Sequence, residues 1–349
     1  MLVYFVLAIP LFPSSVLARN ATCQDHLAPS YPHHPVCPGP PHVYLVKPSQ
    51  GKGLGVFAAR DLDIGDIVMR ETPVIKISLP KLRPGSGYPM AAISKLVHDE
   101  FSMLPPSAQQ QVLALTHYTG AQEDADADTL GDIFRTNAYN TGDKAGLFPR
   151  IARINHSCRP NTSYYWSEKL NKRIIFATRK IKAGEEFFVS YISLLMPQEE
   201  RQKQLDRYGF KCQCEACAQE RAARDASDHH RVTIKNAFAN FDHQLSFTHA
   251  KTVMGIQRAR QNAEASAQLA QLIQAEGLAD YYARAYKIAA ISHAKLEDWQ
   301  SAATWANKGY EVTYMADPES QTTLEMQQLT SVFIANWQTQ LGDRATYLR

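Results

Sequence analysis

The chain has 349 residues, of which 45% are hydrophobic and 20% are charged. These proportions predict a globular protein of roughly two domains and exclude a disordered chain. The net charge of +3 and the lack of a run of Lys or Arg argue against a basic nucleic-acid-binding face, so we expect no direct nucleic acid binding.

The N-terminal segment is open to two interpretations. Residues 2–12 form an apolar run that matches the core of a signal peptide and is too short to span a bilayer. A small-residue stretch at 15–18 resembles a cleavage site, and Asn20-Ala21-Thr22 is a glycosylation sequon. No Lys or Arg precedes the run, however. Residues 1–18 are therefore either a signal peptide or an apolar segment that packs on the protein, and no other stretch predicts a membrane span.

Residues 19–42 are rich in Pro and His and predict an irregular segment, after which β-type runs begin. Four short runs, separated by turn signals, lie at residues 43–46, 55–57, 67–69 and 74–77. Further runs lie at 162–166, 173–178 and 186–191. Short strands in this pattern predict a compact, mostly antiparallel β-domain.

A segment of different character interrupts the β-type runs. Residues 80–89 predict a loop, residues 91–101 and 107–118 have the apolar spacing of helices, and the acidic residues 122–132 predict a solvated loop. We therefore expect a helical insertion in the β-domain. From Pro197 onward the pattern is helical, and residues 225–345 predict a bundle of antiparallel helices with a faint tetratricopeptide-like hairpin near Trp299.

The six cysteines form two groups. Cys23 and Cys37 lie in the N-terminal segment and suit a disulfide if the chain is exported. Cys212, Cys214 and Cys217 are too close in sequence to pair readily with one another. Three closely spaced thiolates favour a tetrahedral Zn²⁺ with a fourth soft ligand, and Cys158 is the candidate. Disulfides among these cysteines in an exported chain are the alternative.

Two further motifs carry groups suited to a binding site. The segment 51–55 has three glycines in five positions, which lets a ligand approach the backbone or simply forms a hairpin turn. The segment 154–161 places two Asn, one His and one Cys before a strand, and polar groups so placed need partners. Tyr191 ends a strand and is either a core tyrosine or a hydroxyl at a pocket.

Together these motifs resemble the SET-domain methyltransferases, and most closely their SMYD (SET and MYND) branch. The resemblance rests on GKGLGVFAARDLDIGDIV, RINHSCRPN and GEEFFVSYISLLMPQEERQKQLDRYGFKCQCEAC, in that order. It covers residues 43–220 and implies an α+β fold. The implied architecture is a SET-type β-fold of short strands at 43–192 with an insertion at about 78–136, a post-SET zinc segment at 193–220 and a helical domain at 221–349.

The resemblance also implies roles for individual residues. Tyr191 would be the catalytic tyrosine, and Tyr208 and Phe188 would line the lysine channel. The residues that would bind S-adenosylmethionine are Lys52, Gly53, Leu54, Asn137, Asn155, His156 and Phe210. The structural Zn²⁺ would be bound by Cys158, Cys212, Cys214 and Cys217. The MYND zinc finger of the branch is absent, because no cysteine lies between Cys37 and Cys158.

The expected activity is methyl transfer from S-adenosylmethionine to a lysine side chain of a partner protein, histone or non-histone. The alternative is a catalytically inactive SET fold that serves as a binding or scaffold protein and is possibly secreted. The thiols and the cofactor favour the cytoplasm or nucleus, whereas the N-terminal segment favours export. Asn155 and Asn161 also lie in sequons, and a glycan on Asn155 would destroy the expected pocket.

Overall fold

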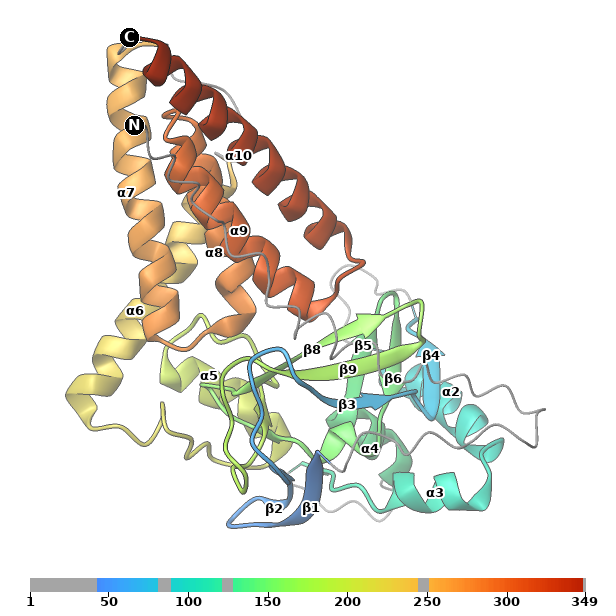
Figure 1. Cartoon of the computed structure of the whole chain (residues 1–349). Coiled ribbons are helices and arrows are strands. Elements are labelled where there is room, and N and C mark those ends of the chain that lie inside the picture. Colours follow the sequence, from blue (N-terminus) through green and yellow to red (C-terminus); the bar gives the residue numbers. More distant parts are fainter. Residues whose placement is uncertain (1–42, 81–88, 121–127, 244–250, 348–349) are drawn as a thin grey trace, which may run out of the picture.

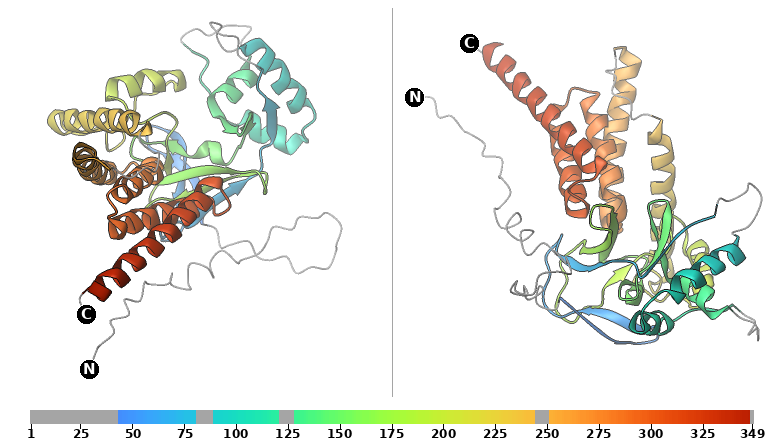
Figure 2. Two further views of the ribbon diagram at one scale, coloured as in Figure 1. Left: turned by 90° about the horizontal axis from the view of Figure 1, so that it is seen from above. Right: turned by 90° about the vertical axis from the view of Figure 1, so that its right-hand side faces the viewer.

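A computed structural model describes residues 43–80, 89–120, 128–243 and 251–347, the side chains up to residue 343 (Figure 1). The expected signal peptide, Cys23 and Cys37 lie outside the described residues. Short helices lie at one end of the β-rich part, and a lobe of long helices stands on its other side (Figures 1 and 2). The mixture of short strands and helices predicted from the sequence is confirmed.

The β-rich part consists of four small sheets. Strands β1 (Tyr44–Ser49) and β2 (Gly53–Ala58) form an antiparallel hairpin. Strand β9 (Lys172–Ala177) lies between β3 (Ile67–Glu71) and β8 (Thr162–Ser167). Strand β6 (Lys144–Leu147) lies between β4 (Ile75–Ser78) and β5 (Ala138–Thr141). Strands β7 (Asn155–His156) and β10 (Phe188–Val189) pair in parallel.

One apolar core joins the β1–β2 hairpin, the β3–β9–β8 sheet and β10, whereas the buried residues of β4 and β6 belong to a separate core. The fully buried members of the first core include Val56, Phe148, Ile175 and Phe187, which come from segments far apart in the sequence. The β1–β2 turn depends on glycine, because Gly51 and Gly53 have φ angles of 72° and 74°, a region that side chains disfavour. The glycine segment is therefore a hairpin turn, and its strand β2 leads toward the site described below.

The insertion is helical, as predicted, but its boundaries differ. Helix α2 (Met90–Ser102) lies at the predicted place, whereas α3 (Pro106–Leu113) ends five residues before the predicted end at residue 118. The acidic segment was predicted to be a loop over residues 122–132, and this prediction is wrong for residues 129–132. Helix α4 (Thr129–Asn137) begins there, because the Asp128 side chain accepts a hydrogen bond from the Gly131 backbone N–H and Leu130 is buried. The acidic side chain is a helix cap.

Two strands directly after the predicted insertion were missed, and the last predicted strand is shorter than expected. Strands β5 and β6 form a hairpin directly after α4, each only four residues long. The β-type run predicted over 186–191 forms a ladder only at β10, two residues long. Runs as short as these give little period-two signal, so pairing with distant strands defines them.

The C-terminal lobe consists of long helices that pack side by side, as the sequence predicted. After α5 (Gln198–Leu205) come α6 (Arg221–Asp242), α7 (Val253–Ala275), α8 (Tyr282–Ala294), α9 (Trp299–Ala316) and α10 (Gln321–Tyr347). Small residues on α8 and α9, among them Ala290, Ala302 and Ala306, let these helices approach closely. No helix in the described ranges has the length and apolar character that crossing a membrane requires.

The packing of α10 on α9 gives a first prediction. Phe333 is 1% exposed and its ring lies 5.9 Å from that of Trp299, whereas its neighbour Val332 is 46% exposed. We expect Phe333→Ala to lower the free energy of unfolding by about 3 to 5 kcal/mol, because it leaves a cavity in this core. Val332→Ala should change it by less than about 0.5 kcal/mol. Denaturant unfolding measures both, and equal effects would contradict the packing described.

Candidate functional site

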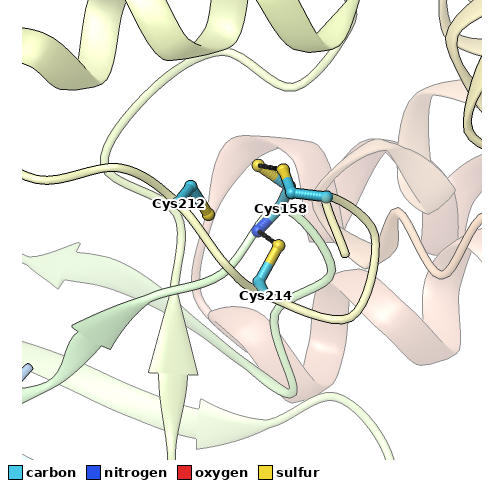
Figure 3. Close-up of side chains that lie close together, drawn as sticks. Cys158, Cys212 and Cys214 are labelled. Carbon is cyan, nitrogen blue, oxygen red and sulfur yellow. Dashed lines mark hydrogen bonds between the residues drawn. The ribbon is translucent and has the colours of Figure 1, made fainter. Parts of the chain in front are cut away.

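The first feature of the site is the meeting of four cysteines. The side-chain sulfur atoms of Cys158, Cys212, Cys214 and Cys217 all lie within 4.8 Å of one another. Figure 3 shows the first three of these side chains converging from two separate segments. The sulfurs of Cys217 and Cys158 are 3.7 Å apart. Four thiolates around a tetrahedral Zn²⁺ at about 2.3 Å have sulfurs about 3.8 Å apart, so this donor set fits the metal.

The surroundings of the cluster suit a negatively charged thiolate site. The backbone N–H of Cys158 points at the sulfur of Cys214 at 3.3 Å. Arg201 is 1% exposed and its Nη2 lies 3.9 Å from the sulfur of Cys217. Buried charges of this kind need compensation, and donors around metal ligands fix their orientation. The four cysteines can therefore hold a structural metal with no open coordination position.

The second feature is a cavity of about 760 Å³ beside this cluster. That volume suits a ligand the size of a nucleoside cofactor. Seven of the residues proposed from the sequence to bind cofactor or substrate line it: Lys52, Leu54, Asn137, Asn155, Tyr191, Tyr208 and Phe210. These residues come from the β1–β2 turn, α4, β7 and the segment on either side of α5. The cavity thus lies where segments far apart in the sequence converge.

Tyr191 has a defined hydroxyl at the cavity wall. Its phenol donates a 2.7 Å hydrogen bond to the Ile154 carbonyl, and its ring lies 5.1 Å from that of Tyr208. Burial, followed by the neighbouring phenol of Tyr208, raises the pKa of Tyr191. The phenol is therefore protonated at neutral pH and is not a general base. Its oxygen keeps lone pairs that can accept a hydrogen bond from a bound group.

At the glycine-turn end of the cavity, Glu186 holds three side chains in place. Its carboxylate accepts hydrogen bonds from Asn155 Nδ2 at 2.7 Å and from Ser49 Oγ at 2.9 Å, and Lys52 Nζ lies 3.2 Å away. A Cβ at Gly55 would approach this carboxylate to 2.3 Å, so a glycine is needed there. Asn155 also donates to the Leu54 carbonyl, which ties strand β7 to the glycine turn.

Three of the proposed residues do not line the cavity: Gly53, His156 and Phe188. The His156 ring is 4% exposed and lies between the cluster and Tyr191. Its Nδ1 accepts the Tyr191 backbone N–H at 3.1 Å, and its Nε2 lies 3.4 Å from the sulfur of Cys158. Burial lowers the pKa of His156 to about 4, so the ring is neutral at pH 7. His156 therefore positions the backbone of Tyr191 without itself lining the cavity.

The Phe188 side chain lies outside the cavity lining and contacts the lining residue Lys52. Lys52 Nζ lies 4.3 Å above the Phe188 ring, and the Phe188 backbone N–H is bonded to Asn161. Sequence reasoning in turn missed several wall residues, notably Tyr139, Tyr164 and Arg173. Tyr164 and Trp166 alternate along β8, a pattern that indicates a strand face turned to one side. Tyr139 lies on the missed hairpin, two residues after Asn137, which the family resemblance did indicate.

Comparison with known proteins agrees with this geometry. Residues 53–192 match the SET domain family. The match begins at the glycine turn and ends one residue after Tyr191. Residues 53–192 form a SET domain. The cavity described above is lined largely by this domain, and the cysteine cluster joins it to the segment that follows.

Several curated proteins with a SET domain match the chain in part. The histone-lysine N-methyltransferase set5 of Schizosaccharomyces pombe is 32% identical over 55% of this chain and 56% of its own length. The N-lysine methyltransferase SMYD2 of Homo sapiens is 36% identical over 31% of this chain and 27% of its own length. The histone-lysine N-methyltransferase SMYD3 of Homo sapiens is 44% identical over 21% of this chain and 17% of its own length. The chain therefore spans about half or less of these relatives.

Asn161 ties the residues just before β8 to the segment of strand β10 and gives a second prediction. It is 2% exposed; its Nδ2 donates to the Glu186 carbonyl at 2.8 Å and its Oδ1 accepts the Phe188 N–H at 2.7 Å. Asn161→Ala leaves both backbone groups unpaired, at about 1 to 3 kcal/mol each. Thermal unfolding should show this loss. Asn161→Asp keeps the acceptor for Phe188 but turns a buried carboxylate toward the Glu186 carbonyl, so it should not restore the wild-type stability. An alanine variant of unchanged stability would contradict the role of these two hydrogen bonds.

Proposed function

We propose that the chain transfers methyl groups from S-adenosylmethionine to lysine side chains of partner proteins. The observation that carries this proposal is the protonated Tyr191 phenol at the wall of a cofactor-sized cavity inside a SET domain. The relatives named as lysine methyltransferases support the same activity. S-adenosylmethionine supplies a methyl group on a positively charged sulfur.

The chain would act by binding and orientation. Lys52, Leu54 and Asn155 at the glycine-turn end, with Asn137 and Phe210, would hold the methyl donor. Tyr191 and Tyr208 would hold the acceptor nitrogen. The lone pair of a neutral lysine nitrogen forms the new bond to carbon, the carbon–sulfur bond breaks, and its electron pair stays on sulfur. No group of the protein has to accept that pair, so positioning and exclusion of water carry the reaction.

The tyrosine hydroxyl is suited to this positioning role. Because its proton is engaged by the Ile154 carbonyl, the phenol oxygen faces the cavity as an acceptor. An acceptor in a half-buried site can orient an amine N–H and can make weak contacts with a polarised methyl group. A Phe at this position would keep the ring and its packing but lose that oxygen.

A third prediction follows for Tyr191. Tyr191→Phe should reduce methyl transfer to a mixture of histone and non-histone proteins by at least about 100-fold. Calorimetric affinity for S-adenosylmethionine should change by less than about threefold, because the ring remains. Tyr165→Phe is the matched control on β8; its ring packs on Phe176, away from the cavity lining. Turnover by Tyr191→Phe close to that of the wild type would reject the assignment.

The same experiment separates the proposal from its alternative. A SET fold that serves only as a binding or scaffold protein would show no methyl transfer in the wild type. Calorimetry then tells whether the cavity has also lost the methyl donor. Binding of the donor together with transfer supports the enzyme, whereas absence of both favours the scaffold.

We propose in addition that the cysteine cluster binds one structural Zn²⁺. Metal analysis should find about one zinc per chain. Cys214→Ser should lose most of it and lower the thermal unfolding temperature, since metal binding energy is also folding energy in such sites. Gln213→Ala, exposed and between two of the cysteines, is the control and should keep the metal. A folded wild-type preparation without metal would remove the zinc site while leaving the cavity argument intact.

A further inference from the structure

The charge distribution of the cavity is unusual for the reaction proposed. Among the described residues that line it are five cationic side chains and no carboxylate: Lys52, Arg135, Arg153, Arg173 and Arg207. Both the sulfonium of the donor and a protonated lysine are themselves positive. Lys52 and Arg135 are paired with Glu186 and Asp132 outside the lining. Arg173 has no such partner and is the most enclosed of the five.

Arg173 is a buried cation without a counter-ion in the described part of the chain. It is 3% exposed, its Nε has no hydrogen-bond partner, and its Nη2 donates to the Asn140 carbonyl. The opposing residue on β3 is Glu71, whose carboxylate is taken by the backbone N–H groups of Arg150 and Ile151. Burial lowers the pKa of Arg173, but a guanidinium stays charged at any physiological pH.

Aromatic rings take the place of the counter-ion. The guanidinium carbon lies 4.8 Å from the centre of the Tyr139 ring, 4.9 Å from that of Tyr164 and 5.4 Å from that of Phe148. Each ring face attracts a cation at such distances. The Tyr139 and Tyr164 rings are themselves 5.4 Å apart in an edge-to-face arrangement. Arg173 is therefore held by ring faces.

These two tyrosines belong to a group of four at the acceptor end. Tyr139, Tyr164, Tyr191 and Tyr208 all line the cavity, and we call them the tyrosine cage. Burial first, and then the phenols of Tyr191 and Tyr164, raise the pKa of Tyr139 well above its ordinary value, as expected for hydroxyls gathered closely. A cage of this composition would ordinarily bind an alkylammonium ion through its ring faces. Here the protein's own cation occupies part of it.

We propose that Arg173 makes the tyrosine cage select against a cationic occupant and in favour of an uncharged amine. Resting on the proposed function, this assigns a specificity-determining role to a residue that the motif comparison did not indicate. Two effects act together: Arg173 occupies ring faces that an ammonium would need, and its buried charge disfavours a second positive charge nearby. The acceptor lysine then enters as the reactive neutral amine. The transfer step itself leaves the methylated product as a positively charged alkylammonium ion, which the cage then disfavours.

The test compares two probes of equal shape and different charge. Choline carries a trimethylammonium group, and 3,3-dimethyl-1-butanol carries an uncharged tert-butyl group of the same size. Binding of each to the full-length, metal-loaded chain is measured by calorimetry or by ligand NMR. We expect the wild type to bind choline no more tightly than the alcohol. Tighter binding of choline by the wild type would overturn the proposal without any variant.

Variants locate the effect in Arg173. Arg173→Met should bind choline about tenfold more tightly than the wild type, with a much smaller change for the alcohol. Arg173→Lys keeps the charge and should resemble the wild type. Arg135→Met removes one charge from an exposed position of the same wall, where the charge is already paired with Asp132, and should have a smaller effect because solvent screens it. A folded Arg173→Met protein, as judged by its unfolding transition, that gains no choline affinity would refute the proposal.

These measurements do not require methyl transfer, so the two proposals can fail separately. A chain that methylates proteins but shows no change in choline binding on Arg173→Met would lose only the role of Arg173. A chain that shows the predicted change in selectivity but transfers no methyl group would lose only the proposed function.

Discussion

The convergence of Cys158 with the cysteines of residues 212–217 is the constraint on which the rest of the site depends. The segment that leads into the second group, α5 and the turn that follows it, buries only Arg201 and Leu205 of its own side chains. Such a segment has too little apolar surface to fix its own path. The cysteine cluster supplies the missing constraint. It returns the chain over strand β7 and places the Phe210 ring 6.3 Å from His156 and the Tyr208 ring 5.1 Å from Tyr191.

A buried arginine connects the cluster to the helical lobe. Arg231 on α6 is fully buried and donates to the carbonyls of Cys158, after β7, and of Leu194, after β10. Glu276, after α7, contacts both Arg231 and Arg159. Burial alone would raise the pKa of Glu276, but hydrogen bonds from Ser227 and His230, together with these arginines, lower it. Because the Glu276 carboxylate is paired with residues of both the lobe and the SET domain, moving one relative to the other would leave a buried charge unpaired. These contacts therefore fix one arrangement of the two parts.

The parts of the site that could be predicted from the sequence are those whose residues lie in short local motifs. The cysteine spacing and the polar string at 154–161 point to side chains whose chemistry demands partners, so their meeting was predictable from residue types alone. Half of the tyrosine cage was not: the resemblance implied site roles for Tyr191 and Tyr208, whereas Tyr139 and Tyr164 join them only after β5 and β8 pair with their neighbours. Arg173 shows this most clearly. Within its β-type run it resembles a surface cation at a strand end, and only the cross-strand aromatic residues make it a buried charge.

The cavity lies where three separate apolar cores meet. The SET β-core, the insertion core around Ile93 and Phe134, and the core shared by the cysteines and α6 are separate clusters. Each is closed by its own side chains, so a gap remains where the three units meet, and such junctions are where ligand sites form. Its walls belong to all three units: Tyr164 packs on the first core, Phe134 belongs to the second, and the segment bearing Phe210 is held by the third. Changes in the insertion can therefore reshape one wall while the tyrosine that carries the proposed chemistry keeps its place.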